Sequence, residues 1–167
     1  MPRRYKHCPH CATAFELRTV RDSEQMVCPE CDFIFWQNPA VGVAVIVRQQ
    51  DKIVLGRRAR GGYQGQWCIP CGYVEYDEDV RHAAQREFLE ETGLHVRVST
   101  VYTVHSNFHA PLMQSVGIWF NGDVVGGELV AGDDLDDVGY FSLREPMPTL
   151  AFPTDVLVID QLREELG

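Results

Sequence analysis

The sequence lacks any hydrophobic run long enough to cross a membrane. Its longest apolar stretch is the eight residues from Ala40 to Val47, which include a glycine, whereas a membrane-spanning helix needs about 20 apolar residues. The segment behind the basic N-terminus also lacks the apolar core of a secretory signal. We therefore expect no membrane partner and a cytoplasmic location.

The chain is also short of positive charge. It has 15 Lys and Arg against 24 Asp and Glu in 167 residues, a formal net charge of -9. An acidic chain does not attract nucleic acid or anionic membranes through bulk electrostatics. If the substrate is anionic, a cation must be added, and a divalent metal ion is the obvious candidate. The remaining composition, 45% hydrophobic and 23% charged, is that of a globular protein.

Cysteine occurs only in closely spaced pairs. The six cysteines form three Cys-x-x-Cys motifs, and 16 residues separate the first two motifs. This spacing is typical of a structural zinc site with four thiolate ligands. Two disulfides or a redox dithiol are the alternatives, and the missing secretory signal disfavours disulfides. We predict a zinc ribbon over residues 1–37 in which the metal supplies the stability, with these ligands: Cys8, Cys11, Cys28 and Cys31.

The predicted ribbon shows no sign of nucleic-acid binding, because residues 1–36 contain as many acidic as basic side chains. A structural or dimer-forming role is expected instead, and a homodimer is one of the expected assemblies. The third pair, Cys68 and Cys71, has no partner pair nearby. A redox motif needs its first cysteine at the start of a helix, and the next expected helix begins about seven residues later. We expect two small buried residues here.

Residues 38–167 predict a second domain with a mixed α/β (α+β) pattern. Alternating and β-branched segments predict strands at 41–48, 52–57, 96–105, 114–120 and 138–141. A helix is expected over residues ~78–92, because acidic residues favour its start and Gly93 its end. A C-terminal helix is expected over 153–166, with Pro153 in its first turn and this apolar stripe: Val156, Ile159, Leu162 and Leu166.

Three carboxylates gather on one face of the expected ~78–92 helix. Glu87 and Glu91 are four residues apart, and Glu90 is three from Glu87. Like charges at this spacing destabilise a helix, and a divalent cation would relieve the repulsion. Such oxygen ligands suit Mg²⁺ or Mn²⁺, which also take substrate phosphates as ligands. Arg86 and Glu90 form an i,i+4 pair. A solvated acidic helix face is the alternative.

The surrounding residues decide between these interpretations. The segment from Gly72 to Leu94 reads Gly-x5-Glu-x7-Arg-Glu-U-x-Glu-Glu-x-Gly-U, where U is a bulky apolar residue. This is the pattern of the Nudix box, with every fixed position filled and Phe88 as a large residue at the first U. Residues 38–167 thus resemble the Nudix hydrolases.

The resemblance implies an α/β/α sandwich in which the box forms a loop, a helix and a loop. It also implies that Glu87, Glu90 and Glu91, with the Gly72 carbonyl, bind Mg²⁺ or Mn²⁺. Glu78 and Arg86 would support the site. The metal would neutralise pyrophosphate oxygens and activate a water, and Glu87, Glu90 or a carboxylate outside the box would take the proton.

The resemblance further implies hydrolysis of a nucleoside diphosphate linked to another moiety. A cysteine-rich ribbon before the domain is found in NADH pyrophosphatases and in a second group that resembles FAD and ADP-ribose pyrophosphatases. The chain lacks the Ser-Gln-Pro-Trp-Pro-Phe-Pro segment of the former, so ADP-ribose or FAD is the expected substrate. NADH, an RNA cap, or non-catalytic nucleotide sensing are the alternatives.

Substrate contacts are harder to assign from the sequence. Arg57 and Arg58 are candidates for binding phosphates, although exposed arginines on a hairpin are usually simple surface residues. The loop that contains Phe108 and His109 is a candidate for holding a base, and an aromatic side chain in a loop is more often packing.

Overall fold

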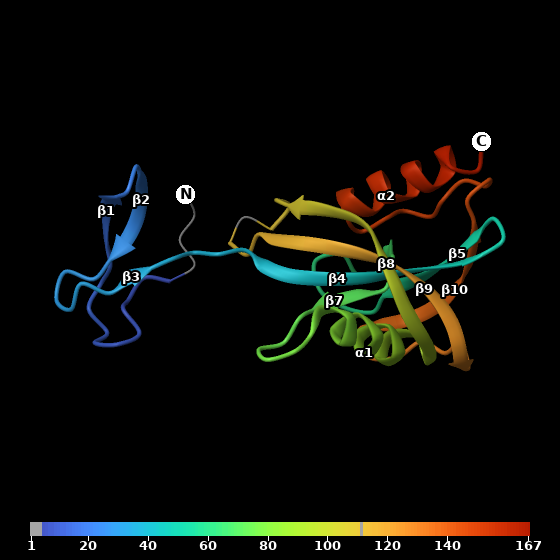
Figure 1. Ribbon diagram of the computed structural model, residues 1–167, viewed down its shortest axis with the longest axis horizontal. Coiled ribbons are helices and arrows are strands. Elements are labelled where there is room, and N and C mark those ends of the chain that lie inside the picture. The colour runs from blue at the N-terminus through green and yellow to red at the C-terminus, as the bar shows by residue number, and fades with distance from the viewer. Residues whose placement is uncertain (1–4, 111) are drawn as a thin grey trace.

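The computed structural model describes residues 5–110 and 112–167 (Figure 1). Its N-terminal part is a three-stranded antiparallel sheet in the order β1-β2-β3, made of β1 (Glu16–Val20), β2 (Ser23–Val27) and β3 (Ile34–Phe35). Arg21 and Asp22 both have positive φ in the β1–β2 turn, as a tight two-residue hairpin requires.

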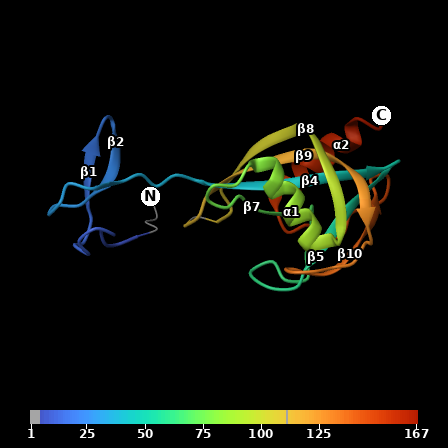
Figure 2. The same cartoon turned by 60° about the horizontal axis from the view of Figure 1, so that its bottom comes forward.

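This small sheet has its own core, which contains Phe15 and Met26 together with two of the cysteines. In both views an extended segment after β3 joins it to the rest of the chain (Figures 1 and 2). The predicted boundary between residues 37 and 38 falls in that segment and stays a prediction. Residues 1–4 of the predicted ribbon lie outside the described residues.

The larger part is built on one mixed sheet in the order β10-β5-β4-β9-β8, with β6 paired to β5 and β7 to β4. Only β4 and β9 among these neighbours run parallel, and the other pairs are antiparallel. The strands are β4 (Ala40–Gln49), β5 (Lys52–Arg58), β6 (Trp67–Cys68), β7 (Cys71–Tyr73), β8 (Leu94–Asn107), β9 (Ser115–Gly127) and β10 (Leu135–Ser142).

Two helices, α1 (Val80–Thr92) and α2 (Pro153–Glu164), cover opposite faces of this sheet (Figures 1 and 2). Phe88 from α1 packs on one face in a cluster with Val45 and Phe120. Val158 from α2 packs on the other face in a second cluster. The alternation of side chains along β4 supplies both clusters, since successive residues of a strand point to opposite faces. The expected α/β/α sandwich is therefore confirmed.

The stripe predicted for the C-terminal helix was wrong at Val156, and its last member, Leu166, lies beyond the end of α2 at Glu164. Val156 is 43% exposed, whereas Val158 is fully buried. The buried face runs through Asp155, Val158, Ile159 and Leu162, and a helix turns about 100° per residue. Val156 therefore lies well to one side of this face, and the charged Asp155 takes the buried place in the first turn.

No helix among the described residues is long and apolar enough to cross a membrane.

Candidate functional site: an acidic helix face beside a cysteine-containing loop

The four N-terminal cysteines converge on one point. Their ligand atoms all lie within 4.8 Å of one another, and the Sγ–Sγ distances are 3.6 Å for Cys8–Cys31, 3.4 Å for Cys11–Cys28 and 3.7 Å for Cys11–Cys31. A tetrahedral ion with Zn–S bonds of about 2.3 Å separates its sulfurs by about 3.8 Å, and a disulfide needs about 2.05 Å. The donor set fits zinc and not two disulfides.

Helix α1 ends where the sequence predicts and begins at Val80, two residues after the expected start. The Asp79 side chain accepts a hydrogen bond from the Arg81 N–H at 2.9 Å and caps the start. Gly93 ends the helix with φ 71° and donates its N–H to the Leu89 carbonyl, the left-handed stop that glycine favours. These two caps fix which residues of α1 face the sheet and which face the loop before it.

The Glu87 carboxylate lies directly against the backbone of Gly72. A Cβ built on Gly72 would lie 1.9 Å from the Glu87 Cδ, so any other residue at position 72 would displace the carboxylate. Burial raises the pKa of Glu87, while the neighbouring Arg86 opposes the rise. The structure thus joins the loop residue and the first helix carboxylate that the resemblance selects, although their metal-binding role stays a prediction.

Glu91 lies deeper than Glu87, with an exposed fraction of 2%. Its Oε2 accepts a hydrogen bond from the Cys71 N–H at 2.8 Å, which ties α1 to the segment that contains Gly72. Burial raises the pKa of Glu91 to about 8, and the nearby charge of Glu87 adds to the rise. Among the described residues no ion pair includes Glu91, and a buried acid of this kind would fit a place where a cation binds.

Arg86 links the supporting residues of the box. Its Nε and Nη2 contact Glu78 at 2.9 and 2.8 Å, and its Nη1 contacts Glu87 at 2.9 Å and Glu90 at 3.3 Å. The two parallel bonds to Glu78 form the fork geometry that arginine favours. This contact holds the pKa of Glu78 at about 2. The network keeps α1 connected to the preceding loop.

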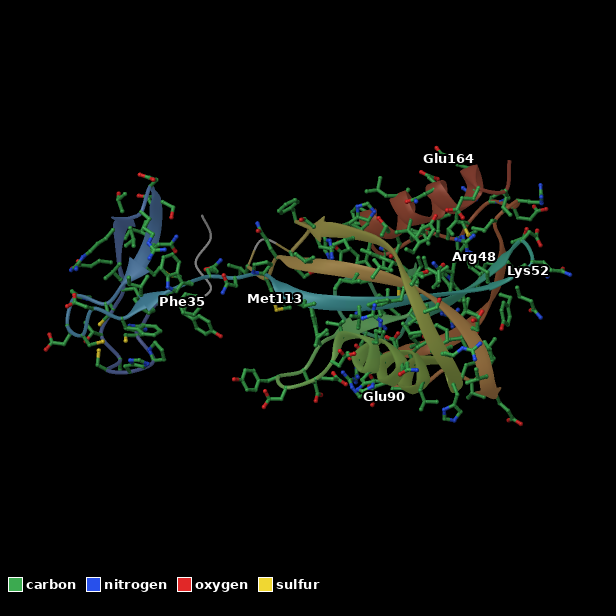
Figure 3. All side chains as sticks on the ribbon, viewed as in Figure 1. Phe35, Arg48, Lys52, Glu90, Met113 and Glu164 are labelled. Atoms are coloured by element: carbon green, nitrogen blue, oxygen red, sulfur yellow. The ribbon has the colours of Figure 1, made fainter. Side chains whose placement is uncertain are left out.

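The three box carboxylates point to one side of α1 without meeting at a single point. Glu90 is the most exposed of them, with half of its side chain accessible, and Figure 3 shows it on the face of α1 that points away from the sheet. Among the described residues, the cysteine set is the cluster whose ligand atoms all come together. The box carboxylates are not brought together at one point, and their role in binding a hard cation stays a prediction.

The loop before α1 is held from both sides by buried carboxyls. Glu91 binds its Cys71 N–H, and Asp155 of α2 accepts a hydrogen bond from the Ile69 N–H at 3.0 Å. Burial raises the pKa of Asp155 to about 7. Sequence reasoning missed Asp155, because nothing in an amphipathic pattern identifies an acid on the buried face. The sequence did place Asp155 in the first turn of a helix that starts with Pro153, and this position was the one feature that could have drawn attention to it.

Cys68 is fully buried and Cys71 half-buried, and both are free thiols. Contact with Cys68 and burial raise the pKa of Cys71 well above its ordinary value. A thiol in this state is a poor nucleophile. The expected burial is confirmed for Cys68, whereas Cys71 is only half-buried.

The two arginines predicted to bind phosphate lie in different surroundings. Arg57 forms ion pairs with Asp136 at 2.7 Å and Asp137 at 3.5 Å. Arg58 is half-buried, its charge opposes the rise in the pKa of Glu91, and its Nε is buried with no hydrogen-bond partner among the described residues. Both roles stay predictions, and the geometry favours Arg58.

Comparison with known proteins decides the family. The family model that is described as the NUDIX domain matches residues 36–162 of the sequence. The chain belongs to the NUDIX domain family. It is 37% identical over 131 residues to the ADP-ribose pyrophosphatase of Methanocaldococcus jannaschii, a match that covers 78% of this chain and 77% of that protein.

Another relative of this NUDIX protein is the NAD-capped RNA hydrolase NudC of Actinobacillus succinogenes, at 28% identity over 153 residues. That match covers 87% of this chain and 56% of the relative, so the chain spans little more than half of that protein. Among solved structures, a NUDIX hydrolase from Nitrosomonas europaea has a TM-score of 0.81 and 30% identity, over 95% of this chain and 89% of that one.

An ADP-ribose pyrophosphatase from Streptococcus suis shares the fold, with a TM-score of 0.63 and 24% identity over 77% of this chain and 92% of its own. These matches confirm the expected family and its hydrolase class. They leave the role of each site residue as a prediction.

Proposed function

We propose that this protein is a Mg²⁺- or Mn²⁺-dependent pyrophosphohydrolase that cleaves a nucleoside diphosphate linked to a second moiety, with ADP-ribose or FAD as the leading substrate. The observation that supports it best is the contact of the Glu87 carboxylate with Gly72, beside the buried Glu91. The likeness to the ADP-ribose pyrophosphatase of Methanocaldococcus jannaschii favours ADP-ribose. We place the protein in the cytoplasm, as predicted.

In this proposal Glu87, Glu90, Glu91 and the Gly72 carbonyl hold the divalent ion. When bound, the ion supplies positive charge to the pyrophosphate oxygens and lowers the pKa of a coordinated water. Oxygen donors of this kind suit Mg²⁺ and Mn²⁺. The thiolates Cys8, Cys11, Cys28 and Cys31 hold a structural zinc ion, and their sulfur spacing supports this part of the proposal.

The protein's own side chains then divide the remaining work. Arg86 fixes the Glu87 and Glu78 carboxylates through its three nitrogens. Glu87, Glu90 or a carboxylate outside the box accepts the proton of the attacking water. Water attacks one phosphorus, the bond to the bridging oxygen breaks, and two phosphate monoesters are formed. Arg58 lies close enough to Glu91 for its charge to act on a phosphate beside that residue.

A substrate panel tests the proposal directly. The purified protein is incubated with ADP-ribose, FAD, NADH, diadenosine polyphosphates and nucleoside triphosphates in Mg²⁺ or Mn²⁺, and the products are separated by chromatography. We expect AMP from ADP-ribose or FAD and no pyrophosphate from triphosphates. Release of products from NADH alone would favour the nicotinamide alternative, and no turnover of any dinucleotide would contradict the proposal.

The variant Glu87→Gln should lower kcat by a factor of about 100 or more while the fold persists. Glu164→Gln is the matched control, because Glu164 is an exposed glutamate on α2, on the opposite side of the molecule from Glu90 (Figure 3). Near-normal turnover by Glu87→Gln would contradict the assigned site, whereas equal losses in both variants would point to a general effect of lost charge.

A further inference from the structure

The segment 67–72 crosses between two strands of the large sheet just before the box helix. Strand β6 pairs with β5 and strand β7 pairs with β4, so Ile69 and Pro70 form the step between them. Pro70 has no N–H group, and its carbonyl accepts the Val45 N–H at 3.3 Å. Ile69 and Cys71, on either side of Pro70, both donate their N–H groups to side-chain carboxyls.

These two carboxyls reach the segment from opposite faces of the sheet. Glu91 on α1 accepts the Cys71 N–H at 2.8 Å, and Asp155 on α2 accepts the Ile69 N–H at 3.0 Å. The two helices cover opposite faces (Figures 1 and 2). Gly72, whose carbonyl is a proposed metal ligand, follows Cys71 directly. The backbone that leads to this ligand is therefore held on both sides.

The hydrogen bond of Asp155 does not serve its own helix. Asp155 is the third residue of α2, which starts at Pro153, and an acid at this place ordinarily turns back to the N–H groups at the helix start. Its Oδ2 instead accepts the N–H of Ile69, which lies 86 positions away in the chain. The carboxyl thus joins α2 to the segment 67–72.

Burial makes this carboxyl a costly choice for packing alone. Asp155 is 2% exposed, and burying a polar group costs free energy. The Ile69 side chain already packs in one apolar cluster with Val158 of α2. Such apolar contacts are not directional, whereas a hydrogen bond restricts the distance and angle of the amide. The acid therefore fixes where the segment lies against α2.

We propose that Asp155 is a positioning residue of the hydrolytic site, which holds the Ile69 N–H and thereby sets the place of Gly72. The Glu87 carboxylate lies against Gly72, so the arrangement of both proposed metal ligands depends on this bond. Asp155 acts through the backbone and touches neither the metal ion nor the substrate. This inference rests on the proposed function and extends its site to the opposite face of the sheet.

Two substitutions at one position separate the hydrogen bond from the charge. Asp155→Ala removes the acceptor, and Asp155→Asn keeps a carbonyl oxygen that can accept the Ile69 N–H. Loss of a group that supports metal ligands lowers metal affinity or turnover by about 10-fold or more. We expect Asp155→Ala to lose this much in both Mn²⁺ affinity, measured by calorimetry without substrate, and kcat. Asp155→Asn should recover most of the loss.

Amide hydrogen exchange followed by NMR reads the bond itself, without turnover. In the metal-free protein, exchange at Ile69 should be about 10-fold faster in Asp155→Ala than in the wild type. In the wild type, saturating Mg²⁺ should slow exchange at Ile69 by about fivefold or more, relative to the buried Leu162 further along α2. Binding of the ion and ordering of the segment must favour each other if the proposal is right.

Two control variants lie on the same helix. Val158→Ala weakens the packing of α2, since Val158 is fully buried, but keeps the carboxyl of Asp155. It should lower the Tm and leave Mn²⁺ affinity unchanged. Asp160→Asn removes an exposed acid of α2 and should change neither. Thermal melting followed by circular dichroism checks that each variant is folded.

Several results would overturn the inference. They are wild-type Mn²⁺ affinity and kcat in folded Asp155→Ala, equal losses of Mn²⁺ affinity in Asp155→Ala and Val158→Ala, and a loss in Asp155→Asn as large as in Asp155→Ala. If Asp155→Ala does not fold, the wild-type experiment decides, because an Ile69 amide that Mg²⁺ does not protect relative to Leu162 would refute the coupling.

The outcomes also separate this inference from the proposed function. If Glu87→Gln keeps full turnover, the proposed hydrolytic site is wrong whatever the Asp155 variants show. If Glu87→Gln is inactive while folded Asp155→Ala keeps wild-type Mn²⁺ affinity and kcat, the site stands and the positioning role of Asp155 fails. An inactive Glu87→Gln together with a loss in Asp155→Ala that Asp155→Asn recovers supports both.

Discussion

Replacing Glu91 by glutamine should stabilise the metal-free protein while it abolishes activity. Glu91 is almost fully buried, and its neighbours provide one hydrogen bond from the Cys71 N–H. The glutamine carbonyl can accept the same hydrogen bond and carries no charge to bury. The ionised Glu91 carboxylate therefore destabilises the metal-free protein. A bound metal ion would offset this destabilisation.

The magnitude follows from the pKa. Glu91 keeps its proton up to about pH 8 in the folded state, against an ordinary value of 4.5. The folded state therefore binds more protons than the unfolded chain between these values, and the free energy of unfolding falls as the pH rises through this window. Glu91 does not reduce the free energy of unfolding below about pH 4.5. The reduction grows above that pH and reaches its full size near pH 8. Between pH 5 and pH 7.5 the loss is about 3 kcal/mol.

Urea unfolding of the wild type and of Glu91→Gln, at pH 5 and at pH 7.5 without Mg²⁺ or Mn²⁺, measures this difference. Far-UV circular dichroism reports on α1 and α2. Asp155 also has a raised pKa, near 7, but it is present in both proteins and its effect cancels. The free energy of unfolding of Glu91→Gln, relative to that of the wild type, should therefore be about 3 kcal/mol higher at pH 7.5 than at pH 5.

The control is Glu164→Gln, an exposed glutamate on α2, whose difference from the wild type should not change with pH. A Glu91→Gln advantage that stays the same at pH 5 and pH 7.5 would refute the reasoning, because it would show that the buried group is not protonated in the folded protein. Adding Mn²⁺ should stabilise the wild type more than the variant, since a ligand that binds the folded state raises its stability.

Three further changes test neighbouring parts of the molecule. Gly72→Ala should displace the Glu87 carboxylate and reduce both kcat and Mn²⁺ affinity by a factor of about 10 or more, measured by steady-state kinetics and titration. Arg86→Lys keeps the charge but loses the forked contact with Glu78, and kcat should fall about 10-fold or more. Cys28→Ser should remove bound zinc, measured by elemental analysis, while the helical circular dichroism persists because both helices lie beyond residue 79.

Each of these variants has its own control or contrary result. Gly62→Ala is the counterpart of Gly72→Ala, because a Cβ there meets no atom within 4 Å, and equal losses in the two would contradict the steric argument. Full activity of Arg86→Lys would show that charge alone suffices. Collapse of the helical signal in Cys28→Ser would show that the larger domain depends on the ribbon.

Much of the architecture follows from local sequence. Asp79 and Gly93 define α1 because a capping carboxylate and a left-handed glycine act within a few residues. The hairpin between β4 and β5 follows from β-branched runs on either side of a polar turn. The acidic face of α1 follows from helical periodicity alone, since residues three and four apart share a face. The cysteine spacing likewise predicted a cluster that the structure brings together.

Other features depend on contacts between distant segments. The burial of Asp155 and its bond to Ile69 depend on how α2 packs on the sheet, and no pattern within α2 specifies them. The same packing left Val156 exposed, against the expected stripe. The contacts among the Tyr63, His109 and Phe152 rings join three distant segments, whereas the sequence singled out Phe108, which is 67% exposed.

The sequence by itself determined the chemistry available to this protein: four thiolates, three carboxylates on one helical face, and a glycine before them. These depend on spacings of a few residues, which local backbone geometry converts into neighbours. Only the tertiary structure decided which carboxylate is buried, which arginine pairs with aspartates, and which rings lie together. Those outcomes depend on long-range packing and desolvation, to which residues far apart in the chain contribute jointly.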